Sequence, residues 1–387
     1  MITVCVIKSR KYPSGEKDVV DGGTLNVRAI INELRRNGCN VDVFTRDEEA
    51  RDRIVVDEPG VRVFRAPFVR STKRNVLERD YEEGRSFVRS VLSHSAFQPE
   101  KYICIHTHHW TSGIGLESRI PLRTKLIHTP HLLAAEKARY NKLLLPSYVE
   151  ASEQALLGRA NHIIALSKSE AVALSSIYGC DNRKIIVAPN GVNDVFFEIP
   201  PLNIKVSHPL SVLYIGRSCR QKGVDILLDA VERIMKSGIS VPIRIVGGPY
   251  GEPEFDKLLE TQIQRASLMN IVERIGEVSH DRIPSLLSDS FIYAQPSRYE
   301  SQGVALLEAM AAGRIVVASD LPAIREYIRH GENGFLVEPE KPQALADTLR
   351  LILTNPELAL PVARAARETA REYTWERMLK TILSAML

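Results

Sequence analysis

The chain has 387 residues, 44% of them apolar, and its 51 Lys and Arg against 47 Asp and Glu give a formal net charge of +4. This length and apolar content predict two domains, each with its own core. The weak positive charge, with acids interspersed among the bases and no aromatic-basic motif, argues against a nucleic-acid-binding protein. A modestly basic surface can still attract a phosphorylated substrate or an anionic membrane face.

The five cysteines are scattered, lie mostly in apolar runs and form no C-x-x-C pair. This usage indicates reduced, buried thiols in a cytoplasmic protein. Residues 1–7 run directly into a basic segment, so no secretory leader is expected. No segment approaches the ~18 to 20 apolar residues that span a bilayer, and any membrane contact would be peripheral.

Short apolar runs alternate with helical patterns along the first half of the chain, which is the signature of parallel strands joined by helices. The runs are residues 2–7, 41–44, 102–106, 125–128, 162–166 and 184–188. A proline-containing segment, 198–203, then reads as an interdomain linker.

The same alternation begins again after the linker, so the sequence predicts an α/β protein with two doubly wound domains in tandem. The second set of runs is 210–215, 242–246, 271–275, 291–294, 315–318 and 334–337, and residues 356–387 are helical in character. Ligands of such sheets bind at the carboxyl ends of the strands, so a cleft between the domains is the expected active site.

A dehydrogenase is the common alternative for such a chain, but no G-x-G-x-x-G motif follows any of the runs. A P-loop lysine motif is missing as well. His106, His108 and His109 form the one histidine cluster, and the first two would point the same way on an extended segment. A zinc site there therefore remains an alternative.

A strand-to-helix turn late in the chain sets two carboxylates, Glu300 and Glu308, around Gly303. Ser301, Gln302 and Gly303 would lie at the helix start, where glycine allows close approach and unpaired N–H groups suit a phosphate. The carboxylates can accept hydrogen bonds from sugar hydroxyls. The segment therefore predicts a sugar-nucleotide site, with two solvated glutamates at a helix start as the alternative.

Two cations follow an earlier strand of the same domain, in the pattern Gly216-Arg217-x4-Lys222. Permanent cations at the end of a strand would neutralise a diphosphate leaving group, whose negative charge grows as a glycosidic bond breaks. A solvated basic loop is the alternative for Arg217 and Lys222 taken alone. The carboxylate segment in the same domain strengthens the diphosphate interpretation.

On these motifs, and in this order along nearly the whole chain, the sequence resembles the family 4 retaining glycosyltransferases of GT-B fold. The matching motifs are Gly22-Gly23, residues 187–192, 215–217 with Lys222-Gly223, 245–248, 300–308 and Trp375-Glu376. The first domain is most similar to the mycothiol-pathway N-acetylglucosaminyltransferases and sucrose-phosphate synthases, through residues 21–27, 43–46, 106–113 and 128–137.

The resemblance implies two Rossmann-like domains facing across a cleft that closes when the donor binds. Residues 1–198 would form the acceptor-binding domain, 199–372 the nucleotide-sugar-binding domain, and 373–387 a helix returning to the first domain. The hinge would lie at 198–203 and before Trp375.

The resemblance also implies roles for single residues. Arg217 and Lys222 would hold the donor diphosphate, Glu308 the ribose hydroxyls, and Glu300 with the amides after it the donor sugar. His131 would contact the donor sugar and line the catalytic cleft, with a packed core histidine as the alternative. The remaining implied donor contacts are Gly23, Gly216, Gly248, Ser301, Gln302 and Gly303, and the implied acceptor contacts are Asn26 and His109.

Departures from the pattern argue against inositol phosphate as the acceptor. The mycothiol enzymes carry a Tyr at the place of His109, a Thr at Leu132 and an Arg near Val149 and Glu150. A phosphate without its paired cation is costly to bind, and a glutamate beside it would add repulsion. Gln302 stands where the family usually has Phe, which changes the wall of the donor pocket.

We therefore predict a hexosyltransferase that works with retention and without a metal, moving a hexose or N-acetylhexosamine from a nucleoside diphosphate, with UDP favoured, to a small or lipid-linked polar acceptor. The donor phosphate would take the acceptor proton. No separate cofactor and no nucleic-acid partner are expected. A sugar-nucleotide epimerase of the same fold and a sugar-nucleotide-binding protein without transferase activity are the alternatives. The sequence leaves the base, sugar, acceptor and oligomeric state open.

Overall fold

The computed structural model describes residues 2–8, 22–47, 54–202, 210–249 and 252–386. Contacts divide the chain into two units. One contains the described residues up to Pro189 and those from Glu376 onward, and the other is built from Asn190–Trp375. The chain thus passes between units at 189–190 and 375–376, whereas the sequence analysis placed the boundaries at 198–199 and 372–373.

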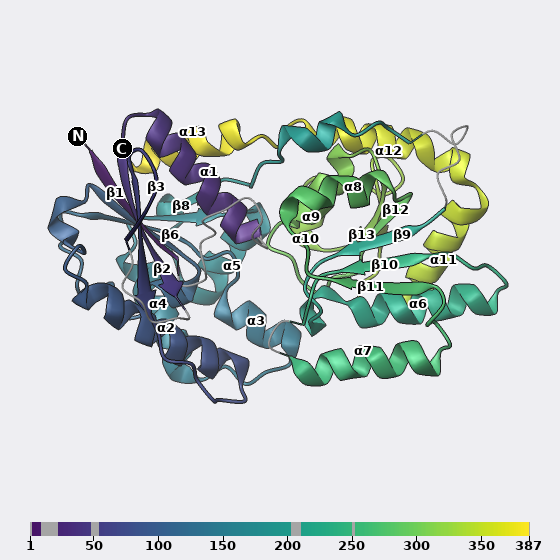
Figure 1. Ribbon diagram of the computed structural model, residues 1–387, viewed down its shortest axis with the longest axis horizontal. Helices are drawn as coiled ribbons and strands as arrows, with labels where there is room; N and C mark the ends of the chain where they lie inside the picture. Colours follow the sequence, from purple (N-terminus) through teal and green to yellow (C-terminus); the bar gives the residue numbers. More distant parts are fainter. Residues whose placement is uncertain (1, 9–21, 48–53, 203–209, 250–251, 387) are drawn as a thin grey trace. The chain divides into compact units, whose positions relative to one another are not determined.

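The first unit contains the strands labelled β1, β2, β3, β6 and β8 in Figure 1. Its sheet has eight strands in the order β3-β4-β2-β1-β5-β6-β7-β8. Every described pair is parallel except β3 with β4. The strands are β1 (Thr3–Lys8), β2 (Asn40–Asp47), β3 (Ile54–Glu58), β4 (Val61–Pro67), β5 (Cys104–His108), β6 (Lys125–Thr129), β7 (His162–Ala165) and β8 (Ile185–Val187). The sequence analysis predicted six of these strands and missed the β3–β4 pair.

Helices surround this sheet, and central strands such as β1 are buried almost throughout. Burial on both faces is the reason that these strands read as continuous apolar runs. The helices are α1 (Gly22–Arg36), α2 (Val76–Ser93), α3 (Ala134–Asn141), α4 (Ser147–Arg159), α5 (Lys168–Tyr178) and α13 (Trp375–Met386), with short 3-10 turns η1 (Pro99–Lys101), η2 (Trp110–Ser112) and η3 (Asn182–Lys184).

The second unit contains a six-stranded parallel sheet in the order β11-β10-β9-β12-β13-β14. Its strands are β9 (Val212–Ile215), β10 (Ile243–Val246), β11 (Val272–Gly276), β12 (Ile292–Gln295), β13 (Ile315–Ser319) and β14 (Phe335–Val337). Strand order reverses between the neighbours β9 and β12, and such a switch point is where open parallel sheets bind ligands. The topology therefore places the loops that follow β9 and β12 side by side.

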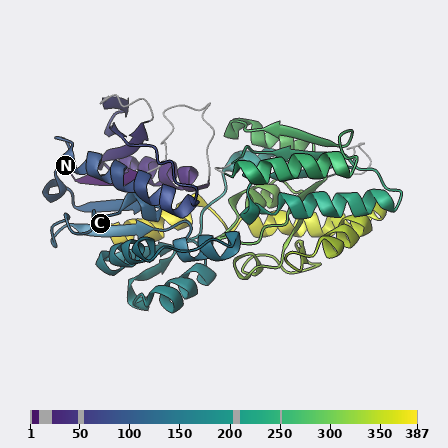
Figure 2. The same cartoon turned by 90° about the horizontal axis from the view of Figure 1, so that it is seen from below.

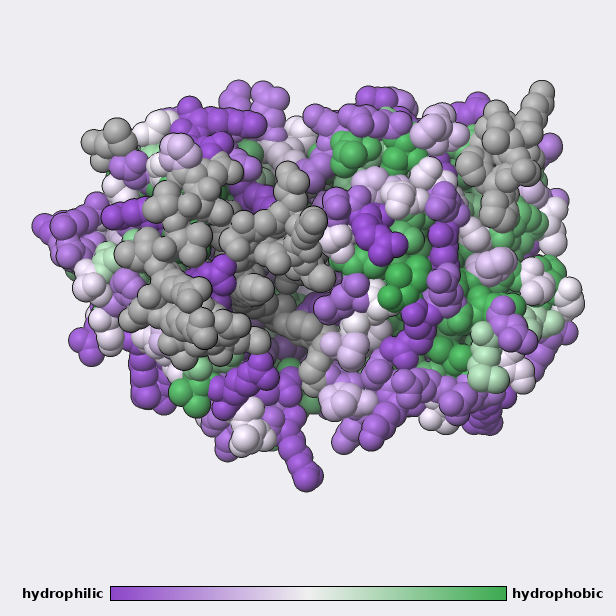
Figure 3. Space-filling model, viewed as in Figure 1, coloured by the Kyte–Doolittle hydropathy of each residue, from purple (hydrophilic) through white to green (hydrophobic). Residues whose placement is uncertain are grey.

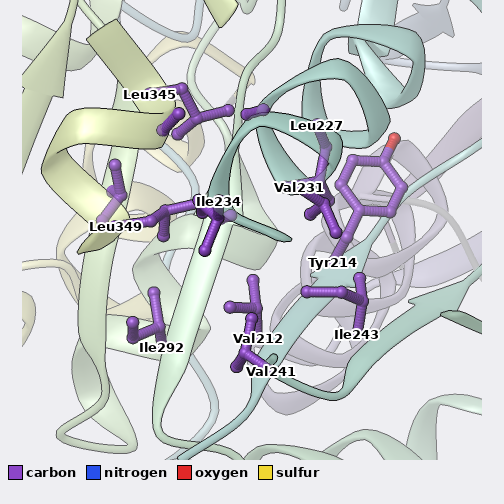
Figure 4. Close-up of a cluster of buried hydrophobic side chains, with 14 of the residues drawn as sticks. Val212, Tyr214, Leu227, Val231, Ile234, Val241, Ile243, Ile292, Leu345 and Leu349 are labelled. Atoms are coloured by element: carbon purple, nitrogen blue, oxygen red, sulfur yellow. The ribbon is translucent and has the colours of Figure 1, made fainter. Parts of the chain in front are cut away.

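Two apolar clusters hold helices against the two faces of this sheet. On one face, side chains of α6 and α11 meet those of β9 and β10 in the cluster drawn in Figure 4, and α6 and α7 lie side by side in Figure 2. Helices α8, α9 and α12 pack on the other face. The elements are η4 (Asp194–Glu198), η5 (Arg220–Lys222), α6 (Val224–Lys236), α7 (Pro253–Arg265), η6 (His280–Arg282), α8 (Ile283–Ser288), α9 (Val304–Ala311), α10 (Pro322–Arg325), α11 (Pro342–Thr354) and α12 (Pro356–Ala370).

The segment predicted as a linker is packed in the second unit. Phe196 and Ile199 are buried, the Arg367 guanidinium donates to the Ile199 carbonyl at 2.6 Å, and Arg314 donates to the Pro200 carbonyl at 2.6 Å. These contacts pack residues 196–200 into the second unit, away from the crossing at 189–190. A hinge at 198–203 stays a prediction, and residue 203 lies outside the described residues.

Large exposed apolar side chains are spread over several elements, for example Leu122, Val172, Met269 and Leu358. Hydrophilic residues separate the apolar areas of the second unit on the face in Figure 3. Among the helices of the described chain, none has both the length and the apolar character required to cross a bilayer.

Candidate active site

The carboxylate of Glu300 is held by several hydrogen bonds at the ends of β9 and β12. Lys222 Nζ lies 2.7 Å and 2.8 Å from its two oxygens, and Gln295 Nε2 and Ser297 Oγ donate to Oε1 at 2.9 Å and 2.7 Å. The Glu300 side chain is only 5% exposed and that of Lys222 is 20% exposed. Charge-assisted bonds of this kind fix both groups in one geometry. Two of the predicted site residues are thus in direct contact.

Backbone contacts hold the cationic loop against the carboxylate loop. Gly223 has a φ of 70°, and a Cβ atom there would lie 2.0 Å from the carbonyl oxygen of Pro296, so a side chain would force the loops apart. The Arg298 amide donates to the Gln221 carbonyl at 2.8 Å. The Arg298 guanidinium binds both carboxylate oxygens of Asp225 at 2.9 Å and 2.7 Å. The loop carrying Lys222 is therefore positioned before any ligand arrives.

Two glycines allow the ends of β9 and β10 to meet. Gly247 has a φ of 126°, and a Cβ atom there would lie 1.9 Å from the carbonyl oxygen of Gly216. Beyond them, the Ser218 amide donates to the Gly248 carbonyl at 2.9 Å. Arg217 is half-buried between these contacts, so its backbone is fixed on both sides as the predicted diphosphate role requires.

Helix α9 begins at Gly303 without a side-chain cap. The φ of Gly303 is 90°, and a Cβ atom there would lie 3.0 Å from both Gln295 Nε2 and the Tyr327 hydroxyl. An uncapped helix start presents backbone N–H groups and the positive end of the helix dipole to an anion. Ser301 and Gln302 precede this start, as the sequence analysis predicted.

The Gln302 side chain makes a contact that the sequence does not suggest. Its Oε1 accepts from the Asn190 amide at 2.8 Å, and its Nε2 donates to the Asn190 carbonyl at 3.0 Å. Both polar atoms of the side chain bond to Asn190. A contact between Gln302 and the sugar nucleotide, as predicted, would therefore be made by the backbone amide of Gln302.

Glu308 lies in α9, separate from Glu300 in the loop, as expected from their spacing. Its Oε1 lies 2.8 Å from His280 Nε2, and the His280 ring contacts Phe196 edge-on at 5.6 Å between ring centroids. The sequence analysis missed His280, which stands alone in the sequence without a motif. Its contact with Glu308 depends on how the loop after β11 folds onto α9.

A group of histidines lies at the carboxyl ends of β5 and β6 in the first unit, with His106, His108 and His128 buried and His131 half-buried. His108 Nδ1 lies 3.1 Å from His131 Nε2, and their rings stack at 5.3 Å. The His106 and His108 rings are 4.0 Å apart. His131 follows β6 with a φ of 59°, a left-handed backbone that is uncommon for a residue with a side chain.

Burial keeps the imidazoles of His106, His108 and His128 neutral. It lowers the pKa of His106 and of His128 to about 3, and it lowers the pKa of His108 well below its ordinary value, with the neighbouring histidines adding to each effect. No group of metal ligands was found among the described residues. The histidine cluster thus offers no three-ligand site among these residues, and the zinc alternative gains no support from the structure.

The other residues that the resemblance assigned in the first unit are mostly buried. Asn26 is completely buried on α1 and Gly23 is half-buried at its start. His109 has a φ of 70°, and its Nδ1 lies 2.8 Å from Thr111 Oγ1. Their roles as acceptor and donor contacts stay predictions.

The predicted residues thus form two groups, one in each unit. In the second unit the structure brings together the loops and helix start that carry Gly216, Arg217, Lys222, Gly248, Glu300, Ser301, Gln302, Gly303 and Glu308. Gly23, Asn26, His109 and His131 belong to the first unit.

Comparison with known proteins also divides the chain into two parts. Residues 20–196 match the model of Glycosyltransferase Family 4, and residues 197–369 match that of Glycosyl transferases group 1. A D-inositol 3-phosphate glycosyltransferase of Arthrobacter sp. is 30% identical over 378 residues, covering 92% of this chain and 88% of that protein. The protein of that name from Rhodococcus erythropolis is 29% identical over 412 residues, covering 99% and 90%.

Solved structures share the fold over the whole chain. Sucrose-phosphate synthase from Thermosynechococcus elongatus has a TM-score of 0.81 at 23% identity, with 100% of this chain and 98% of that chain covered. HepE of Anabaena in complex with UDP and glucose has a TM-score of 0.76 at 19% identity, with 100% and 99% covered. The chain therefore belongs to the group 1 and family 4 glycosyltransferases and has their GT-B fold of two Rossmann-like units.

Proposed function

We propose that this glycosyltransferase moves a hexose or N-acetylhexosamine from a nucleoside-diphosphate sugar to a small polar acceptor, with retention of configuration and without a metal ion. The observation that carries the proposal is the Lys222–Glu300 pair at the β9–β12 switch point, beside the uncapped start of α9. A UDP-linked donor is supported by the neighbour HepE, whose structure contains UDP and glucose.

In the proposed reaction the donor diphosphate lies between the cationic loop and the start of α9. Negative charge develops on this diphosphate as the glycosidic bond breaks, and Arg217, Lys222 and the first amides of α9 would stabilise it. Glu300 would accept hydrogen bonds from the donor sugar while holding Lys222 in place. The departing phosphate would take the acceptor proton, so no side chain is required as a general base.

The test is an assay of the full-length protein with UDP-, GDP- and ADP-linked sugars. At least one donor should raise the unfolding temperature, and with a suitable acceptor an α-linked donor should give an α-linked product by NMR. A β-linked product would contradict retention. An isomerised sugar nucleotide without transfer would instead support an epimerase, and no binding of any sugar nucleotide would contradict the donor site.

Chelation is expected to leave transfer unchanged, because side-chain cations and helix amides would do the work of a metal ion. Rates measured with excess EDTA and with added magnesium should agree within about two-fold, far below the effect of a metal that supplies several kcal/mol. Loss of activity in EDTA with recovery in magnesium would show that the cationic loop is not sufficient.

Inositol phosphate is expected to be a poor acceptor, although relatives are named for it. Leu132 and Val149 are buried apolar residues, and Glu150 is an exposed acid. Without an arginine at that place the acceptor phosphate would lose a charge-assisted bond of about 1.5–3 kcal/mol, or about 10- to 100-fold in kcat/KM. The Rhodococcus erythropolis relative, assayed in parallel, is the control, and equal efficiency of the two proteins would contradict the prediction.

A cytoplasmic location is part of the proposal. All five cysteines are unpaired, and only Cys180 is not fully buried. Unpaired thiols are typical of a reducing compartment.

A further inference from the structure

The side-chain amide of Gln302 forms two hydrogen bonds with the backbone of Asn190. Its amide accepts from the Asn190 N–H at 2.8 Å and donates to the Asn190 carbonyl at 3.0 Å. Gln302 is 3% exposed and Asn190 is 2% exposed. Buried backbone groups are costly when their partners are removed, so this two-point contact joins the segments around the two residues firmly.

Asn190 lies where the chain enters the second unit, and Trp375 lies where it leaves. We call residues 190–193 and 373–375 the crossing segments. The Val192 amide donates to the Tyr373 carbonyl at 2.9 Å, and Trp375 Nε1 donates to Asn193 Oδ1 at 2.7 Å. The two crossing segments therefore form one hydrogen-bonded pair.

Close packing leaves little freedom between the crossing segments. A Cβ atom on Gly191 would lie 2.1 Å from the backbone nitrogen of Trp375. Only glycine permits the two backbones to approach so closely. Movement of one crossing segment must therefore displace the other.

A second connection runs through the backbone of Gln302. The Tyr327 hydroxyl donates to the Gln302 carbonyl at 2.6 Å. The Tyr327 ring contacts Tyr373 edge-on, with 5.7 Å between ring centroids. Gln302 is thus held by its side chain and by its carbonyl, and both routes lead to the crossing segments.

We propose that Gln302 is a positioning residue that couples the loop before α9 to the crossing segments. The inference rests on the proposed function, because it takes a nucleoside diphosphate as the ligand of this loop. A ligand that orders the loop then also orders the crossing segments. Coupling between two sites is reciprocal, so a change in the order of the crossing segments should also be felt by a nucleotide bound at this loop.

Amide hydrogen exchange of the full-length protein with and without UDP tests this coupling. In the unaltered protein UDP should slow exchange in residues 216–223 and in both crossing segments. Gln302→Met keeps the length of the side chain but removes both hydrogen bonds. In this variant UDP should still slow exchange in 216–223, while its effect on the crossing segments falls by about five-fold or more.

Gln221→Met is the matched control. Gln221 is also a buried glutamine of the donor loops, and its Nε2 donates to the Tyr299 carbonyl at 3.3 Å without reaching the crossing segments. This variant should keep the response of the crossing segments to UDP. If Gln302→Met does not fold, Tyr327→Phe removes the second connection alone and should reduce the same response.

Two results would overturn the inference and differ in their meaning. If UDP slows exchange in 216–223 but the crossing segments do not respond, or respond equally in Gln302→Met, the coupling is refuted and the donor site stands. If UDP, GDP and ADP slow exchange in neither place, the donor site of the proposed function is refuted, and the coupling with it.

Discussion

Replacement of Lys222 by alanine is expected to lower kcat by about 100- to 1000-fold, or about 2.7–4 kcal/mol, the range for loss of one preorganised group that stabilises transition-state charge. Loss of the ion pair with Glu300 lowers kcat in two ways. The variant loses a cation facing the developing diphosphate charge, and it leaves a carboxylate that is 5% exposed without its counter-ion. The affinity for the donor ground state should change less than kcat, because the full charge exists only in the transition state.

Steady-state kinetics on Lys222→Ala, Glu300→Gln and the double variant, with one control, separates these effects. In Lys222→Ala with Glu300→Gln the buried charge is removed together with its partner, so the double variant should lose less than the sum of the two single losses. Lys236→Ala is the control, since Lys236 is 73% exposed and pairs with Glu232 on the same helix. Unchanged kcat in Lys222→Ala, with the whole loss in donor affinity, would contradict the assigned role.

The sequence predicts all six strands of the second unit. The clearest cases are β12 and β13, which are buried throughout and therefore read as continuous apolar runs. The sequence misses β3 and β4, because β4 alternates buried and exposed residues and the pair is antiparallel. A search for apolar runs does not detect this pattern. The prolines near residue 200 suggest a linker, so the sequence places the domain boundary at 198–199. The structure places it at 189–190, because Phe196 and Ile199 are buried in the second unit.

The site is predictable as a set of residue types but not as a set of contacts. Lys222 and Glu300 stand 78 positions apart, and only the order of β9 and β12 in the sheet places them together. His280 and the side-chain contact of Gln302 could not be found from sequence, because each depends on a loop reaching a distant backbone or helix. A single histidine or glutamine in a chain carries no signal of such a contact.

The largest expected loss of stability comes from Arg314, which is completely buried. Its guanidinium donates to the carbonyls of Ala312, Ser290 and Pro200 at 2.9 Å, 3.2 Å and 2.6 Å, and lies 3.3 Å from that of Ser288. Burial lowers the pKa of Arg314 to about 10, so the group is still charged near neutral pH. One side chain therefore provides the hydrogen-bond donors for backbone carbonyls of several segments.

Arg314→Met fills much of the same volume but donates no hydrogen bonds, so the buried carbonyls of Ala312 and Ser290 lose their partner at about 1–3 kcal/mol each before relaxation. We expect a loss of about 3–5 kcal/mol, which lowers the Tm of the second unit by about 6–20 °C. Arg350→Met is the control, because Arg350 is 52% exposed on α11, and it should change stability by about 0.5 kcal/mol or less. Calorimetric scans of both variants check the difference. Equal Tm values would show that water can replace the guanidinium among these carbonyls, and the segment at Pro200 would then be held mainly by its apolar contacts.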